Sequence, residues 1–157
     1  MQPKNVVLIM ADQMRKDSMG CYGNACAHTP NLDWLAGQSV RFERSYVANP
    51  ICMPNRLSLF SGMTPSHHGL WTNGLCEGDP CKTLPETLRQ NGYQTASIGK
   101  IHFSPYSVES VGRSVESAAA WNGVPDADCL DKPYYGFDYT ELTIGHTLPK
   151  AHYYRWF

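Results

Sequence analysis

A cysteine, a proline and an arginine alternate in the segment Cys52-Met53-Pro54-Asn55-Arg56. Pro54 suits the first turn of a helix, because its fixed φ is helical and its missing N–H is one that a helix start leaves unpaired anyway. Apolar residues follow at helical spacing, and Gly62 can end the helix. Cys52 is therefore expected at a helix N-terminus, which favours an anion, and Arg56 adds a planar cation suited to an oxyanion. The alternative is a buried free cysteine in a loop, the commoner state of any single cysteine.

A lysine and a histidine form a second candidate group in Gly99-Lys100-Ile101-His102. Residues 93–98 are typical of a strand, and the strand follows a predicted helix, as it does in a parallel sheet. Alternation beyond the strand would put Lys100 and His102 on the same side, so one anion could meet both. Taken alone, such a pair is more often an exposed lysine beside a packed histidine.

The third candidate group is Asp12 with Gln13, which follow the apolar run Asn5–Met10. A continuous run of this kind is typical of a strand that is covered on both faces. Open α/β sheets place their ligands just past the carboxyl ends of such strands, where Asp12 would lie. The alternative is an aspartate that caps the next turn.

These segments resemble the signature motifs of type I sulfatases, members of the alkaline-phosphatase-like superfamily. The segment around Cys52 resembles the family's Cys-x-Pro-x-Arg motif, although Asn55 stands where Ser or Ala is usual. Gly99-Lys100-Ile101-His102 resembles the family's Gly-Lys-x-His motif. Asp12 matches the first of two metal-binding acids, and Gln13 replaces the second, as in relatives resembling choline sulfatases and phosphonate monoester hydrolases.

The resemblance implies a sulfuric ester hydrolase in which Cys52 is oxidised to formylglycine by a formylglycine-generating or anaerobic sulfatase-maturing enzyme. The hydrated aldehyde would attack sulfur, Lys100 and His102 would bind the sulfate, and Arg56 would stabilise charge. Asp12, Gln13 and the modified Cys52 would bind Ca²⁺, or alternatively Mg²⁺. The expected substrate is a sulfated small molecule or carbohydrate.

The resemblance also implies an α/β fold, namely part of an alkaline-phosphatase-like three-layer sandwich with a mixed, largely parallel central sheet. Residues 1–157 are interpreted as the N-terminal part of a sulfatase catalytic domain, and residues 104–131, rich in Ser, Gly and small residues, as an insertion loop near the site entrance. The family's further metal ligands and second lysine are absent from this sequence, so the chain alone is expected to be inactive.

Other elements follow from local signals. A helix is predicted from Pro30 to Gly37 with Thr29 as its cap, and a strand over residues 40–47. A capping box at Thr83 predicts a helix that runs to Gly92, and residues 139–144 predict a further strand.

Composition excludes several classes of function. The net charge of −1 gives no electrostatic basis for binding nucleic acid or an anionic membrane, and no apolar run is long enough to span a bilayer. The N-terminus shows no secretory h-region, so a cytoplasmic location is expected.

Two alternatives to this function remain open. The first is a phosphonate monoester or phosphate diester hydrolase, which Gln13 favours. The second is a non-catalytic module in which zinc is held by Cys21, Cys26, Cys76 and Cys81, although free thiols are the better default for the six cysteines. Two loop segments also contain candidate residues. His67 and His68 are expected to have a hydrogen-bonded structural role rather than to bind a metal. Asn73 is interpreted as a turn residue that could also reach the site.

Overall fold

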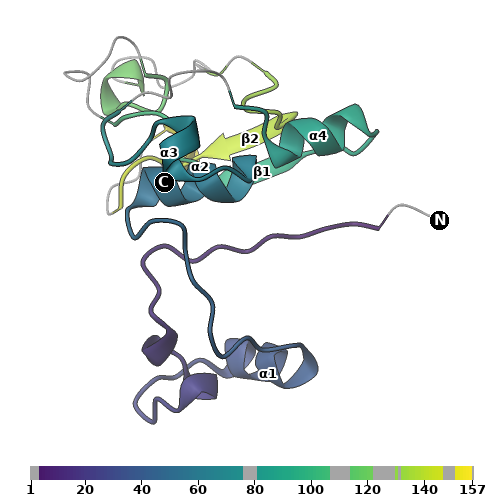
Figure 1. Ribbon diagram of the computed structural model, residues 1–157, viewed down its shortest axis with the longest axis vertical. Helices are drawn as coiled ribbons and strands as arrows, with labels where there is room; N and C mark the ends of the chain where they lie inside the picture. Colours follow the sequence, from purple (N-terminus) through teal and green to yellow (C-terminus); the bar gives the residue numbers. More distant parts are fainter. Residues whose placement is uncertain are drawn as a thin grey trace. The chain divides into compact units, whose positions relative to one another are not determined.

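The computed structural model describes residues 4–75, 81–106, 114–121, 130, 132–146 and 151–156. By its internal contacts the chain divides into two units, Met1–Ser45 and Tyr46–Phe157, and each is described by itself. Figure 1 shows the course of both units.

The first unit contains two short 3-10 helices, η1 (Lys16–Ser18) and η2 (Gly20–Tyr22), and the helix α1 (Pro30–Gln38). The predicted start of α1 after Thr29 is confirmed, but the helix continues through Gly37 to its last residue, Gln38. The Thr29 hydroxyl does not cap the helix. It accepts the N–H of Gly20 at 2.9 Å instead, and it lies 3.1 Å from Asp33 Oδ1.

The strands predicted over residues 5–10 and 40–47 are wrong. The structure describes both segments, and neither forms a strand. Apolar side chains in both segments are exposed, for example 81% for Val7 and 84% for Ile9. An apolar pattern marks a segment that favours a sheet, but a strand also requires a neighbouring strand to hydrogen-bond with. No such neighbour pairs with these segments among the described residues.

The second unit is built from helices and a parallel pair of strands. Its elements in chain order are α2 (Cys52–Ser61), α3 (Pro65–His68), α4 (Leu84–Gln90), β1 (Ala96–Gly99), η3 (Ala118–Trp121), β2 (Tyr139–Leu142) and η4 (Ala151–Trp156). The strands β1 and β2 run in the same direction, in the register Ala96 to Tyr139 through Gly99 to Leu142. The predicted helix–strand unit and its parallel pairing are confirmed, with strands shorter than the sequence patterns.

Two local predictions about α4 are confirmed. Thr83 caps α4, since its hydroxyl accepts the N–H of Glu86 at 3.3 Å, and the helix ends before Gly92. The same hydroxyl donates to the carbonyl of Tyr135 at 2.6 Å, so the cap also holds the turn that precedes β2.

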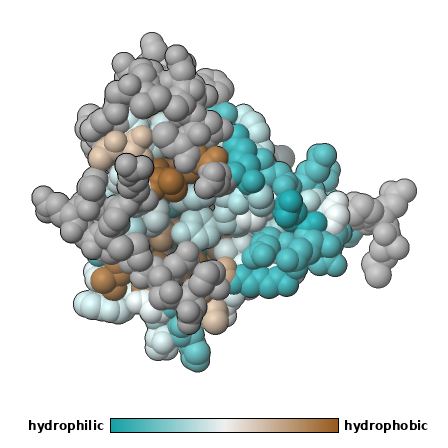
Figure 2. All heavy atoms as spheres, turned by 90° about the horizontal axis from the view of Figure 1, so that it is seen from above, coloured by the Kyte–Doolittle hydropathy of each residue, from teal (hydrophilic) through white to brown (hydrophobic). Residues whose placement is uncertain are grey.

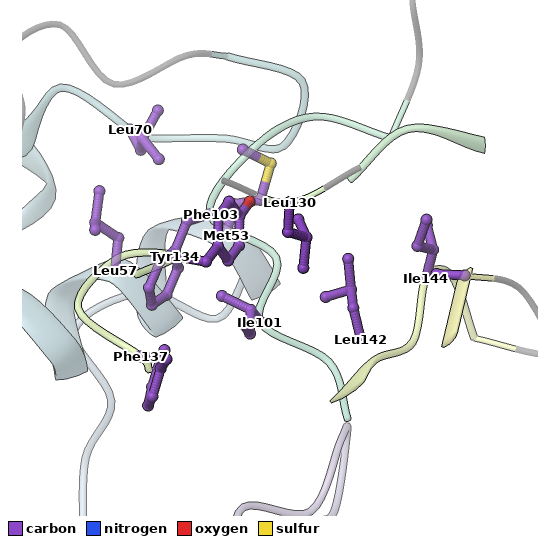
Figure 3. Close-up of a cluster of buried hydrophobic side chains, with 11 residues drawn as sticks. Met53, Leu57, Leu70, Ile101, Phe103, Leu130, Tyr134, Phe137, Leu142 and Ile144 are labelled. Atoms are coloured by element: carbon purple, nitrogen blue, oxygen red, sulfur yellow. The ribbon is translucent and has the colours of Figure 1, made fainter. Parts of the chain in front are cut away.

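A buried apolar cluster lies between α2, the chain that follows β1, and the chain around β2 (Figure 3). Met53 and Leu57 enter it from α2, and Ile101 and Phe103 enter it from the segment just after β1. The cluster therefore packs the start of α2 against the segment that carries Lys100. In Figure 2, hydrophilic surface lies on the side of α4, and hydrophobic atoms are visible in smaller patches. No helix in the described residues is long and apolar enough to cross a membrane.

Candidate functional site

Cys52 is the first residue of α2, as predicted, and Gly62 ends the helix with a left-handed φ of 71° and an N–H bond to Ser58 O of 2.9 Å. Ile51, the residue before the helix, has no side-chain cap. The cap comes instead from Asn73, whose Oδ1 accepts the N–H of Met53 at 3.0 Å. The unpaired N–H groups of the first turn are thus partly satisfied from a separate loop.

That loop is attached to α2 at a second point, because the N–H of Gly74 lies 3.3 Å from Met53 Sδ. The chain before the helix is held as well, since Asn49 Oδ1 accepts the N–H of Ile51 at 2.8 Å. Asn73 is the residue that the sequence predicts in a turn and able to reach the site. Its Asn-Gly signal predicted the turn but carried no information on which helix the side chain would reach.

Arg56 connects α2 to the end of β1. It is 5% exposed, and its Nη1 donates to the backbone carbonyl of Lys100 at 2.6 Å. The arginine of the first motif and the lysine of the second are therefore in contact in the folded chain, 44 residues apart in sequence. This contact is made by Nη1 of the guanidinium. The predicted role of Arg56 in binding an oxyanion stays a prediction.

Lys100 and His102 meet at one aromatic ring, that of Tyr106. The His102 ring stacks on Tyr106 with centroids 3.8 Å apart and an interplanar angle of 3°. Lys100 Nζ lies 5.9 Å from the centroid of the same ring and 3.5 Å from the ring nitrogens of His146. His102 itself is buried, at 2% exposure, and has a left-handed φ of 60°. Both side chains thus contact the Tyr106 ring, and the prediction that one anion could meet both stays a prediction.

Sequence reasoning missed Glu116, which holds the same segment from the other side. Its carboxylate is fully buried and accepts the backbone N–H groups of His102, Phe103 and Ser104. Tyr134 Oη donates to it as well, at 2.9 Å. Glu116 belongs to the stretch 104–131 that was predicted to be an insertion loop, and that interpretation stays a prediction. No motif marks this glutamate, and only its position in a Ser-rich stretch of the sequence could have drawn attention to it.

His68 has the hydrogen-bonded structural role that was preferred for it. Its Nδ1 accepts the N–H of Leu70 at 3.1 Å, and its Nε2 lies 2.8 Å from Ser58 Oγ on α2. Since Nδ1 is an acceptor, the proton of the neutral ring belongs on Nε2. Burial lowers the pKa of His68, which favours this neutral form. The neighbouring His67 is exposed and bonds Thr64 Oγ1 through Nδ1 at 2.7 Å.

Asp12 and Gln13 lie in the first unit with exposed side chains, and Gln13 has a left-handed φ of 52°. In the part of the chain that the structure describes, no three His, Cys, Asp or Glu side chains are grouped so as to hold a metal ion. Cys21, Cys26 and Cys52 are free thiols. Cys76, the further member of the predicted zinc set, lies outside the described residues. The metal and zinc assignments both stay predictions.

Comparison with known proteins places this geometry in context. The family model described as Sulfatase matches residues 4–150. The uncharacterized sulfatase YidJ of Escherichia coli K12 is 32% identical over 145 residues, which are 92% of this chain and 28% of that protein. The chain thus spans between a quarter and a third of the length of that relative.

Two solved structures are similar in fold as well as in sequence. A structure of BT4656 in complex with its substrate D-glucosamine-2-N,6-O-disulfate is 35% identical, with a TM-score of 0.52, over 57% of this chain and 18% of that one. The phosphonate monoester hydrolase of Agrobacterium radiobacter is 26% identical, with a TM-score of 0.60, over 87% of this chain and 25% of that one.

Proposed function

This chain belongs to the sulfatase family, within the alkaline-phosphatase-like superfamily, and we propose that it supplies the nucleophile-bearing part of a sulfuric ester hydrolase. The observation that carries the proposal is the contact between two motifs. Cys52 begins α2, and Arg56, one turn later on the same helix, bonds the backbone of Lys100. A nucleophile position, a guanidinium and a lysine are thereby tied into one region of the second unit. The described α/β fold with its parallel strand pair is part of the family's sandwich.

The proposed nucleophile is the formylglycine made from Cys52. One hydroxyl of its hydrate attacks sulfur, the sulfur–oxygen bond to the alcohol breaks, and the alcohol leaves with a proton. The second hydroxyl then loses its proton, the bond between the formylglycine carbon and the sulfate oxygen breaks, and sulfate departs as the aldehyde returns. The position at a helix N-terminus suits this nucleophile, because the N–H groups of the helix favour negative charge on the attacking oxygen.

Each remaining side chain has a proposed task. Lys100 binds the sulfate oxygens, whose charge must be stabilised while the ester bond breaks. His102, on the same Tyr106 ring, contacts the sulfate or gives a proton to the leaving oxygen. Arg56 keeps Lys100 in place by donating to the Lys100 carbonyl, and it adds positive charge next to the nucleophile.

Asp12 and Gln13 are the proposed protein ligands for a divalent cation, together with the modified Cys52. Both exposed side chains offer oxygen donors, one carboxylate and one carboxamide, and these donors suit Ca²⁺. Gln13 contributes one negative charge fewer than a second acid would. A bound cation would supply charge stabilisation at the reacting oxygens.

The proposed substrate is a sulfated carbohydrate or a related small sulfate ester. Its support is the likeness to a protein whose structure holds D-glucosamine-2-N,6-O-disulfate as its substrate. The proposed partner is a formylglycine-generating or anaerobic sulfatase-maturing enzyme, which must act before any turnover.

The test is the chemical state of residue 52 in the whole protein, expressed with a maturing enzyme. Peptide mass spectrometry is expected to find the mass of the aldehyde in place of the thiol, because Cys52, Pro54 and Arg56 are in register with the family motif. The Cys52→Ala variant is the control for both mass and activity. Soluble protein that keeps an unmodified thiol at Cys52 under these conditions would overturn the proposed nucleophile.

A phosphonate monoester hydrolase is the second candidate, and Gln13 together with the structural likeness to the Agrobacterium enzyme favours it. The two candidates share the nucleophile, so the formylglycine experiment does not separate them. Parallel kcat/KM values for an aryl sulfate and an aryl phosphonate monoester do. A clear preference for the phosphonate would put the second candidate first.

A further inference from the structure

The segment that carries Lys100 and His102 is held at its backbone from two sides. Arg56 donates to the carbonyl of Lys100 at 2.6 Å. Glu116 accepts the N–H groups of His102, Phe103 and Ser104, which follow Lys100 in the same segment. The first contact comes from the helix that begins with Cys52, and the second comes from a segment with no assigned role.

The contacts of Glu116 converge on one carboxylate. The N–H of His102 donates to Oε2, and those of Phe103 and Ser104 donate to Oε1 at 2.9 and 3.1 Å. Tyr134 Oη also donates to Oε1, at 2.9 Å, and Ser104 Oγ lies 3.4 Å away. Phe103 and Tyr134 belong to the same buried apolar cluster (Figure 3), so two of the donors come from residues of the core.

Three consecutive N–H groups can face one anion only if the backbone curls around it. His102 provides this curl, because its φ of 60° is in the left-handed region that non-glycine residues rarely adopt. Such an arrangement of successive N–H groups is an anion-binding nest, and here the anion belongs to the protein itself. The carboxylate therefore compensates for the unusual conformation of His102.

We propose that Glu116 is a positioning residue for the sulfate-binding segment, fixing the backbone turn that brings Lys100 and His102 to the Tyr106 ring. This inference rests on the proposed function, which gives Lys100 and His102 the task of binding sulfate. Glu116 itself is fully buried and touches backbone and core side chains, so it acts through the segment and does not contact substrate.

The arrangement of donors around the Glu116 side chain requires a carboxylate rather than an amide. A carboxylate is an acceptor on both oxygens and meets all of these N–H and O–H donors without a hydrogen of its own. The amide of a glutamine has nearly the same shape, but its NH₂ group would face at least one N–H donor. Burial raises the pKa of Glu116, while the same donors act in the opposite direction.

The test compares four variants of the whole, formylglycine-bearing protein, among them Lys100→Ala as the test of the proposed function itself. Glu116→Gln removes the acceptor pattern at nearly constant volume. Tyr134→Phe is the matched control, because it removes one donor to the same carboxylate and leaves the three N–H bonds of the segment in place. Glu141→Gln controls for the loss of charge, since Glu141 is a partly exposed residue of β2 that bonds Tyr139.

Two readouts are expected to change together in Glu116→Gln. Hydrogen exchange should accelerate at least about tenfold at one or more of the His102, Phe103 and Ser104 amides, because the NH₂ group of glutamine replaces one of the two acceptor oxygens. The kcat/KM for an aryl sulfate should fall by about 10- to 100-fold, as for a modest misplacement of groups that orient substrate, and inhibition by inorganic sulfate should weaken. Both control variants should stay within about twofold of the parent in kcat/KM.

The outcomes separate this inference from the proposed function. A folded Glu116→Gln protein with unchanged amide exchange overturns the positioning role, whatever its activity. So does parental kcat/KM in Glu116→Gln when Lys100→Ala is impaired. If Lys100→Ala is also unimpaired, the proposed function fails, and amide exchange alone decides the structural part. Should Glu116→Gln not fold, hydrogen exchange in the parent protein tests the positioning role. Amides of Phe103 and Ser104 that exchange as slowly as those of β1 support this role of Glu116, and fast exchange overturns it.

Discussion

At the scale of single residues, Lys100 and Asp12 offer the sharpest comparison, because the proposal gives them different partners. Lys100 follows β1 in the second unit, and Asp12 is an exposed carboxylate in the first. One is assigned to sulfate and the other to a cation, so their loss should impair the whole protein in different ways.

Lys100→Ala is expected to lower kcat/KM by about 10²- to 10³-fold, the effect of deleting one stabilising donor, with metal content unchanged. Asp12→Ala is expected to lower metal occupancy, because a hard cation needs several oxygen ligands, and excess Ca²⁺ or Mg²⁺ should restore part of the rate. Parallel kinetics and metal analysis check both, with the exposed Lys82→Ala as the control. Parental turnover of aryl sulfate by Lys100→Ala would contradict the assignment and would favour the phosphonate alternative.

His68 permits a prediction about pH. Its folded pKa lies below the ordinary value of 6.5 because the ring is buried. A histidine of this kind contributes its stability in full above the unfolded pKa, and that contribution is lost as pH falls from 6.5 toward the folded pKa. Between about pH 7.5 and pH 5.5, the free energy of unfolding should therefore fall more in the parent than in His68→Gln, by at most about 1.4 kcal/mol per pH unit.

Denaturant unfolding at the two pH values measures the difference, and His67→Gln controls for the removal of a neighbouring imidazole. Equal pH dependence in the parent and in His68→Gln would mean that the buried ring is not held neutral by its contacts with Leu70 and Ser58.

At the scale of elements, the sequence predicts what depends on neighbours in the chain. The start of α2 at Cys52, its end at Gly62 and the cap of α4 at Thr83 all follow from local rules, and all are confirmed. The strands predicted at 5–10 and 40–47 are not, since strands depend on partners far away in sequence.

The candidate site divides in the same way. Cys52, Arg56, Lys100 and His102 could be identified because each belongs to a short motif. Glu116 could not, because its importance lies in a bond to backbone 14 residues away in sequence. Asn73 is identified as a turn residue that could reach the site, but the sequence does not predict its bond to Met53, 20 residues away. Long-range side-chain-to-backbone bonds leave no periodic or motif signal.

A glycine at the turn before β2 shows how closely two elements are packed. Gly136 has a φ of 87°, and a Cβ built on it would lie 2.3 Å from the backbone nitrogen of Glu86 in α4. Gly136→Ala should therefore destabilise the protein by about 3 kcal/mol or more, because both the backbone conformation and the packing of α4 must change.

Gly62→Ala is the matched control for this prediction. Gly62 also has a left-handed φ, 71°, but no described atom lies within 4 Å of its would-be Cβ. Its substitution should cost only about 1–2 kcal/mol, the price of the left-handed backbone alone. Thermal or denaturant unfolding of the two variants gives the comparison, and equal losses would show that α4 does not pack tightly against the turn.

At the scale of the whole molecule, the relevant fact is how little of the family's length this chain represents. It covers 28% of YidJ and 25% of the phosphonate monoester hydrolase chain. In the described residues, the apolar run after the N-terminus stays exposed, with Val6 at 73% and Val7 at 81%. Exposed apolar runs of this kind bind other surfaces or aggregate.

We therefore predict that residues 1–157 expressed alone, with a maturing enzyme present, show no sulfatase turnover and bind a hydrophobic dye such as ANS strongly. The physical reasons are the exposed run and the proposed cation site, whose proposed ligands Asp12, Gln13 and the modified Cys52 are fewer than the six to eight oxygen ligands that Ca²⁺ takes. Turnover and dye fluorescence are measured against the whole protein, with Cys52→Ala in both lengths as the background. Turnover by the short chain at the rate of the whole protein, above that background, would show that the chemistry needs nothing beyond these residues.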